Sequence, residues 1–320
     1  MSFSLQMIRI SLRALRWIRG KKSPTLQEAR RRFRRIGHFT KVSKSTKITQ
    51  LGANGVLCEY YSPPNEDPQA LIVFLHGGGY CIGSLDTYRA WLSRLAECSN
   101  IPILAVAYQQ APEHPFPTAP SNALSAYEWA LNQYNNKKIF LLGDSAGGGL
   151  ALATMLKMRE ENIPLPQAAI LIAPWVDLTL EKDSLTRLAH KDLIMRKKDL
   201  EMLANLYAGK EAKTNPFISP LFASLEGLPP VYIQQGTEDL FFDEVNALHK
   251  KLLEAGVKSH LEIWKGMPHV WHLMYDQLKE AKQATQSIVA FIRKQITTEN
   301  VILGNQKNTS QKSVSDNKPQ

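Results

Sequence analysis

A Gly-x-Ser-x-Gly motif at residues 143–147 constrains this 320-residue chain more than any other feature. Apolar runs flank it at residues 139–142 and 150–153. A short buried strand, a sharp turn and then a helix is the context in which an enzyme presents a nucleophilic serine. The turn forces a strained backbone on Ser145 and leaves no room for neighbouring side chains. We therefore predict Ser145 as a nucleophile, supported by Gly143, Asp144 and Gly147.

A second glycine-rich loop follows the apolar residues 71–75 and reads His-Gly-Gly-Gly-Tyr at residues 76–80. Adjacent glycines let backbone N–H groups approach a ligand oxygen without obstruction. A phosphate-binding loop is the alternative, but the segment lacks the Gly-x-Gly-x-x-Gly spacing and the Lys-Ser/Thr ending. We predict an oxyanion hole here. Its donors are the backbone N–H groups of Gly77, Gly78 and Ala146, and His76 and Gly79 are supporting residues.

Five segments together resemble the hormone-sensitive-lipase-like branch of the α/β-hydrolases, also called the family IV bacterial esterases. The resemblance extends over residues 51–291, and it is carried by residues 76–80, Tyr108 with residues 111–117, residues 143–148, residues 174–178 and residues 215–244. It implies an α/β fold with an eight-stranded, mostly parallel sheet, helices on both faces and a helical cap. It also implies a carboxylic-ester hydrolase. No cofactor or metal is expected, since the histidines and cysteines lack zinc-site spacing.

The catalytic acid of this fold follows the serine in the chain and precedes the histidine. Residues 231–235 are typical of a strand, and the turn-rich residues after them end at Asp239. Glu238 and Asp243 are rivals for this role. The resemblance favours Asp239, because the family pairs its acid with a second acidic couple like the one at Asp243. Phe241 stands where the family usually has leucine.

The base is expected in the loop after the strand-like residues 260–264. His269 lies there, and a histidine is suited to proton transfer near neutral pH. Val270 follows it where most of the family has glycine, a departure that bears on the backbone angle of the loop. His272 is a nearby competitor. His249 and His260 fall in a helix and a strand and are predicted to be surface residues.

Glu113 belongs to a proline-rich segment at residues 111–117. It could serve as a second acid, but we favour a supporting role in a stiffened loop beneath the oxyanion segment. Asp86 is likewise predicted to cap a helix.

The net charge of +10 is concentrated near the N-terminus. Residues 1–47 hold 14 basic residues and one acid, hence +13, which leaves −3 for the rest. Aromatic residues are not interleaved with these charges, so nucleic-acid binding is not expected. Residues 1–20 are typical of an amphipathic helix, with Arg9, Arg13 and Arg16 on one side and an apolar surface of Leu5, Ile8, Leu12, Leu15 and Ile18. Peripheral contact with an anionic membrane is one interpretation, and a purely structural cap helix is the other.

The chain is expected to divide into five parts. These are an N-terminal cap portion (1–45), a first core part (46–180), an inserted cap portion (181–214), a second core part (215–297) and a disordered polar tail (298–320). A capping box at Thr25 and Glu28 predicts a second helix through Arg35 in the first part, with a solvated face of Arg30, Arg31, Arg32 and Arg34. The Asn54-Gly55 pair predicts a hairpin over residues 46–60.

Composition is compatible with one large core, since 44% of the residues are hydrophobic. The odd number of cysteines favours a reducing compartment, hence a cytoplasmic protein, and no apolar stretch is long enough to span a membrane. We expect hydrolysis of short- to medium-chain acyl esters by a Ser-His-Asp triad through an acyl-enzyme. The alternatives are a deacetylase or amidase of an acetylated small molecule, or a non-catalytic receptor. The oligomeric state is left open.

Overall fold

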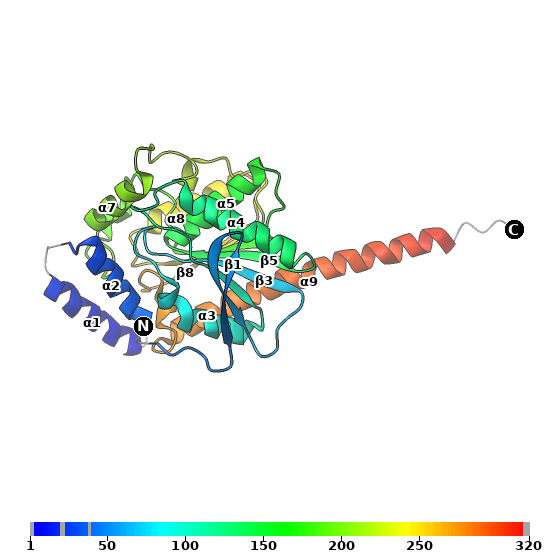
Figure 1. The fold of residues 1–320 in the computed structure, drawn as a ribbon, viewed down its shortest axis with the longest axis horizontal. Helices are drawn as coiled ribbons and strands as arrows, with labels where there is room; N and C mark the ends of the chain where they lie inside the picture. Colours follow the sequence, from blue (N-terminus) through cyan, green and yellow to red (C-terminus); the bar gives the residue numbers. More distant parts are fainter. Residues whose placement is uncertain (1–2, 20–22, 38–39, 316–320) are drawn as a thin grey trace.

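The structure is a computed structural model that describes residues 3–19, 23–37 and 40–315. Its centre is an eight-stranded sheet in the order β1-β2-β4-β3-β5-β6-β7-β8 (Figure 1). The pairs that include β1 or β2 are antiparallel, and all others are parallel. The strands are β1 (Lys47–Ala53), β2 (Val56–Ser62), β3 (Ala70–Leu75), β4 (Ile103–Val106), β5 (Lys138–Asp144), β6 (Ala168–Ile172), β7 (Val231–Gly236) and β8 (Ser259–Trp264). The predicted fold class is confirmed.

The central strands are apolar along their whole length because helices cover both faces of the sheet. Every residue of β3, β4, β6 and β7 is buried. The edge hairpin of β1 and β2 instead has exposed positions on β1. Its register pairs Ala53 with Val56, and Asn54 and Gly55 between them have positive φ angles of 45° and 84°. The predicted hairpin and its two-residue turn are therefore confirmed.

Helices pack on the two faces in separate groups. One hydrophobic cluster joins α3 and α9 to one face, and another joins α4, α5 and α8 to the opposite face (Figure 1). The helix bounds are α3 (Leu85–Ser99), α4 (Thr118–Gln133), α5 (Ala146–Glu160), α8 (Phe242–Glu254) and α9 (Lys279–Ser315). Ser84 caps α3 by accepting a hydrogen bond from the Asp86 amide over 3.2 Å. The cap predicted at Asp86 is therefore two residues too late.

Helix α9 continues beyond the core as a single projecting helix (Figure 1). A disordered tail was expected from residue 298, but the backbone is helical as far as Ser315. The absence of proline lets the established helix propagate. The described backbone thus differs from the expected tail over residues 298–315, and residues 316–320 lie outside the described part.

Two short cap helices occur within residues 181–214, α6 (Ser184–Arg187) and α7 (Lys197–Ala208). The N-terminal helices are α1 (Phe3–Arg19) and α2 (Leu26–Ile36), and both halves of the predicted capping box open α2. Single 3₁₀ turns occupy Pro220–Phe222 and Trp271–Met274. Among the described residues, no helix combines the length and apolarity needed to cross a bilayer.

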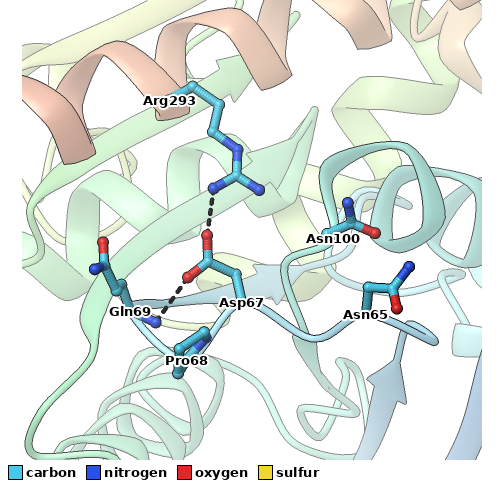
Figure 2. Close-up of a pocket in the computed structure, with 6 residues that line it drawn as sticks. All are labelled: Asn65, Asp67, Pro68, Gln69, Asn100 and Arg293. Atoms are coloured by element: carbon cyan, nitrogen blue, oxygen red, sulfur yellow. Dashed lines mark hydrogen bonds and ion pairs between the residues drawn. The ribbon is translucent and has the colours of Figure 1, made fainter.

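A surface pocket of about 400 Å³ marks where α9 leaves the core (Figure 2). Arg293 of α9 reaches into it and pairs with Asp67 in the loop before β3. Asp67 also accepts the Gln69 amide over 2.8 Å. The ion pair connects α9 to this loop, so the charged residues that line the pocket have a structural role.

Candidate active site

Ser145 occupies the turn between β5 and α5. Its backbone angles are φ 51° and ψ −123°, a combination that residues with side chains rarely adopt. A Cβ on Gly143 would overlap the carbonyl oxygen of Gly147, and a Cβ on Gly147 would overlap that of Leu75. The structure therefore contains the strained turn, and the steric need for both glycines, that the motif predicts.

His269 and Asp239 lie at the ends of adjacent parallel strands, in the loops after β8 and β7. Nδ1 of His269 donates a hydrogen bond to Oδ2 of Asp239 over 2.8 Å, and Asp239 is fully buried. The other carboxylate oxygen accepts the Phe241 amide over 2.8 Å. With Nδ1 as the donor, Nε2 carries the lone pair that a general base needs.

The electrostatic surroundings favour the protonated form of His269. Burial on its own would lower the pKa of His269, but the carboxylate of Asp239 outweighs it, with help from Asp192 and Asp144, so the pKa is raised. Asp144 directly precedes Ser145. Among the described residues, the hydrogen bond of His269 is the one to Asp239, and its link to the serine turn is electrostatic, through Asp144.

The rival acids are engaged elsewhere. Glu238 forms an ion pair with Arg9 over 2.7 Å. Asp243 binds Arg187 over 2.6 Å and accepts the Ser184 amide over 2.8 Å. The structure thus brings only Asp239 of these three into a described hydrogen bond with His269.

The rival histidines are also explained. Nε2 of His272 donates to Oε1 of Gln234 over 2.7 Å, and burial lowers the pKa of His272 to about 3. His272 is therefore neutral and part of the core. His249 bonds to Ser259 over 2.8 Å, and His260 stacks on Tyr232 at the edge strand.

The predicted oxyanion donor Gly77 has a different role. Its N–H donates to Oδ1 of Asp144 over 2.9 Å and to the Tyr88 hydroxyl over 3.1 Å. This amide faces into the protein, so Gly77 is wrong as an oxyanion donor. Sequence reasoning also missed Tyr88, whose hydroxyl donates to Asp144 over 2.8 Å. Burial raises the pKa of Asp144 to about 7.

The next two glycines have backbone conformations that favour glycine. Gly78 and Gly79 have φ angles of 112° and 59°, which side chains tolerate poorly. Within the described part of the chain, the amides of Gly78, Gly79 and Ala146 donate to no protein acceptor. Ala146 opens helix α5, whose first amides lack partners within the helix. These three N–H groups are available to a ligand.

His76 stabilises the start of the oxyanion loop. Its Nδ1 lies 2.8 Å from the Gly77 carbonyl oxygen, and its ring stacks on Tyr108 with centroids 4.3 Å apart. Burial lowers the pKa of His76 to about 4, so the ring is neutral. Tyr108 also donates to the His76 carbonyl over 2.7 Å.

Glu113 connects the proline-rich loop to the N-terminal helices. Its carboxylate accepts two hydrogen bonds from Arg30 of α2, over 2.7 and 2.6 Å, and Arg30 lowers the pKa of Glu113 to about 2. Arg30 also donates to the carbonyl oxygens of Cys81 and Ala111. The anchoring role predicted for Glu113 agrees with these contacts, but Arg30 is not the solvated residue that we expected.

Two departures from the family pattern lie against His269. The Phe241 ring meets the imidazole edge to face, with centroids 5.4 Å apart, and stacks on Trp175 at 5.6 Å. Val270 has φ 46° and ψ 50°, the left-handed conformation that glycine adopts more easily. Phe241 therefore packs directly against the base, a contact that the sequence did not indicate.

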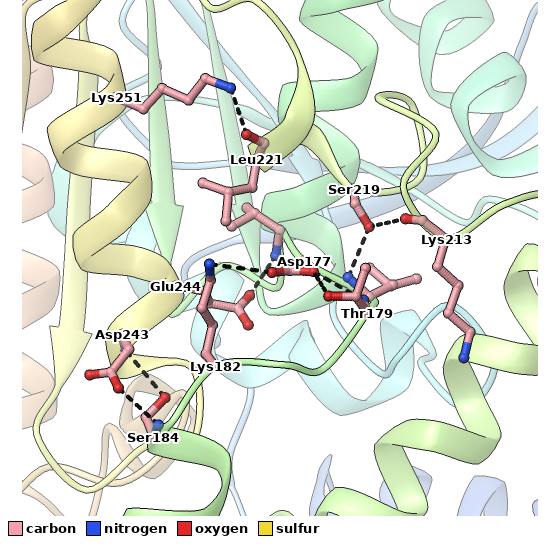
Figure 3. A network of polar contacts seen from close by, with 12 residues as sticks. Asp177, Thr179, Lys182, Ser184, Lys213, Ser219, Leu221, Asp243, Glu244 and Lys251 are labelled. Atoms are coloured by element: carbon pink, nitrogen blue, oxygen red, sulfur yellow. Dashed lines mark hydrogen bonds and ion pairs between the residues drawn. The ribbon is translucent and has the colours of Figure 1, made fainter.

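A polar network joins the start of α8 to the loop after β6 (Figure 3). Oε1 of Glu244 accepts the Val176 amide over 2.7 Å, and Asp243 accepts the Ser184 amide over 2.8 Å. Burial raises the pKa of Glu244 well above its ordinary value, against the opposing effect of the hydrogen bond from Val176. The acidic couple thus fixes the helix that directly follows the Asp239 loop.

Comparison with known proteins adds independent findings. A family model described as the α/β-hydrolase fold matches residues 72–273. The chain is 37% identical to an acetyl-hydrolase from Streptomyces hygroscopicus over 73% of this chain and 79% of the relative. It is 34% identical to an esterase from Acinetobacter venetianus, over 69% and 74%. The crystal structure of an esterase from the bacterial hormone-sensitive lipase family superposes with a TM-score of 0.87 at 35% identity, covering 92% of this chain and 99% of that one.

Proposed function

The chain belongs to the α/β-hydrolase family, in its hormone-sensitive-lipase branch, and is a serine carboxylesterase, and from this premise we propose that Ser145, His269 and Asp239 are its catalytic triad. The observation that carries the proposal is the buried 2.8 Å hydrogen bond from His269 to Asp239. The strained backbone of Ser145 and the raised pKa of His269 add support. Such strain is common where a side chain must be held in a reactive position.

In the proposed reaction, Nε2 of His269 takes the hydroxyl proton of Ser145 as the serine oxygen attacks the ester carbonyl carbon. Asp239 holds the imidazole in the required tautomer and stabilises its cation. His269 then protonates the leaving alcohol as the acyl-enzyme forms. Water, deprotonated by His269, attacks the acyl carbon; the bond to the Ser145 oxygen then breaks, His269 returns the proton to that oxygen, and the carboxylic acid is released.

The negative charge on the carbonyl oxygen needs donors that are already in place. We assign this role to the amides of Gly78, Gly79 and Ala146, which replaces the initial choice of Gly77. Each donor would stabilise the transition state by roughly 3 kcal/mol, as single-donor deletions in other hydrolases indicate. Because these are backbone groups of fixed geometry, they need no reorganisation during the reaction.

We propose that residues 1–45 and 181–214 form a cap that limits the acyl group to short and medium length. Tyr207 of α7 stacks on Tyr80 with centroids 3.7 Å apart. Leu203 of the same helix packs so closely on Gly79 that a Cβ there would overlap it. The cap helix therefore lies directly against the oxyanion loop, and these contacts are our reason for expecting a limit on acyl length.

A panel of p-nitrophenyl esters of graded acyl length tests this substrate class. We expect the highest kcat/KM for chains of about two to eight carbons in a mostly apolar pocket. Preferential hydrolysis of emulsified long-chain triglyceride, with a rate increase at the lipid interface, would contradict it. Including an acetanilide and an acetylated sugar in the panel distinguishes the esterase from the amidase or deacetylase alternative.

We also propose peripheral contact with anionic membranes through α1, by a different surface from the one first expected. Arg9 and Arg16 bind the rest of the protein, so these two charges do not face lipid. Three apolar side chains on the opposite side are exposed instead, Phe3 (78%), Met7 (48%) and Ile10 (57%). Their spacing places them on one helical stripe that lipid could cover. The side chains of Leu15 and Ile18 lie outside the described part.

A further inference from the structure

Asp192 is a buried carboxylate in the loop between α6 and α7. Its Oδ1 accepts the amides of Ile194 and Met195, each over 2.8 Å, and its Oδ2 accepts the Leu240 amide over 3.0 Å. Leu240 is the residue directly after Asp239. One side chain of the inserted cap portion therefore fixes both its own loop and the backbone beside the proposed catalytic acid.

Helix α1 holds the same region from outside. The guanidinium of Arg16 donates to the carbonyl oxygens of Asp192 and Ala189, the latter over 2.9 Å. Arg9, two turns earlier, forms its ion pair with Glu238, which directly precedes Asp239. The side chains of this pair are 15% and 14% exposed, so solvent screens it only in part. Asp192 thus binds the backbone of the residue after Asp239, and α1 binds the side chain of the residue before it.

We propose that Asp192 is a positioning residue for Asp239, and that α1 secures it through Arg16 and supports the other side of Asp239 through Arg9. The inference rests on the proposed triad, in which Asp239 orients the imidazole. Asp192 touches no reacting atom in this scheme. It acts by holding the loop from which Asp239 meets His269, and small displacements of such groups slow catalysis strongly.

Asp192 also has an electrostatic effect that a purely structural contact would lack. Burial and the neighbouring Asp239 raise the pKa of Asp192 to about 6, so it is largely ionised at neutral pH. The titratable groups that face it are Asp239 and His269, while Arg16 binds its carbonyl. His269 in turn faces Asp239, Asp192 and Asp144. Removing the charge of Asp192 therefore lowers the pKa of His269.

The test begins with Asp192→Asn and a matched control. The asparagine oxygen can keep the bonds to Ile194 and Met195, but its NH₂ group then faces the Leu240 amide and cannot accept from it. We expect kcat to fall about tenfold with little change in KM, and the acid limb of kcat/KM to move to lower pH. The control is Asp199→Asn. This substitution also removes a carboxylate of the inserted cap portion, but Asp199 accepts a hydrogen bond from Ser23 over 2.6 Å and not from the loop that carries Asp239.

A double-variant cycle with Asp239→Asn separates positioning from general damage. If Asp192 acts through Asp239, its substitution costs little once Asp239 is changed. An equal loss of kcat in both backgrounds, or an unmoved acid limb, overturns the inference. Glu238→Gln, at the more accessible flank, gives a second measurement should Asp192→Asn fail to fold, and it should also lower kcat without raising KM. Wild-type kcat in Asp239→Asn would overturn the proposed triad itself. If Asp239→Asn loses activity but Asp192→Asn and Glu238→Gln keep it, only the present inference is overturned.

Discussion

The amide of Gly77 donates a hydrogen bond over 2.9 Å to the carboxylate of Asp144, the residue before Ser145. This bond links the oxyanion loop to the turn that carries the proposed nucleophile. It also turns the Gly77 amide inward, whereas the next two amides, those of Gly78 and Gly79, have no described protein acceptor. The relative position of the proposed nucleophile and the proposed oxyanion donors therefore depends on a buried carboxylate outside the proposed triad.

Substituting Gly77→Ala should lower kcat sharply, because the new Cβ would overlap the Asp144 carboxylate and lie 2.9 Å from the Tyr88 hydroxyl. Tyr88→Phe is the milder change. It removes the hydroxyl that binds both Gly77 and Asp144, and should lower the free energy of unfolding by about 1–3 kcal/mol. Urea unfolding and ester kinetics measure both effects. Gly52→Ala is the control, since nothing lies within 4 Å of a Cβ there. An equal loss of kcat in Gly52→Ala and Gly77→Ala would contradict the steric explanation.

The identity of the acid can be tested by comparing carboxylates of one loop. Asp239→Asn should lower kcat by up to about 10⁴-fold, because the amide favours the wrong imidazole tautomer. Asp243→Asn should have a far smaller effect, since Asp243 binds Arg187 and the Ser184 amide. Kinetics at saturating substrate give the comparison. The reverse order of effects would transfer the acid role to Asp243.

The pH dependence of kcat/KM should report the raised pKa of His269. The base must be neutral to accept a proton, so activity is lost as the pH falls through this pKa. Since the shift is upward, we expect the acid limb to have its midpoint above about 6.5, the ordinary value for histidine. A pH profile with a short-chain ester measures it. A midpoint well below the ordinary value would mean that burial, not the carboxylates, dominates around His269.

Several features were predictable because their signals are local. The Asn54-Gly55 turn, the capping box of Thr25 and Glu28 and the glycines around Ser145 each depend on residues a few positions apart. The bond from Gly77 to Asp144 and the contacts of Arg9 with Glu238 and of Asp192 with Leu240 join distant segments. No periodicity or motif encodes them. The misassigned oxyanion donor and the unexpected role of the arginines share this physical cause.

Membrane contact predicts a measurable loss on removing apolar side chains from α1. The double variant Phe3→Ser, Ile10→Ser should sediment less with anionic vesicles than the wild type, because both side chains are exposed on one stripe. Leu253→Ser is the control, because this apolar residue of α8 is also exposed (52%). The basic N-terminal segment should make wild-type binding weaker at high salt. Binding that is absent, or the same in all three proteins, would leave α1 a purely structural helix.

The most direct test of the central claim is inactivation by a serine-directed phosphonate, followed by mass spectrometry of the protein and its peptides. The account predicts complete loss of esterase activity with one phosphonyl group per chain, attached to Ser145. It also predicts that Ser145→Ala has no turnover and takes up no label, while its circular dichroism spectrum and thermal unfolding remain those of a folded protein. Label on another residue, or wild-type turnover by Ser145→Ala, would contradict the account.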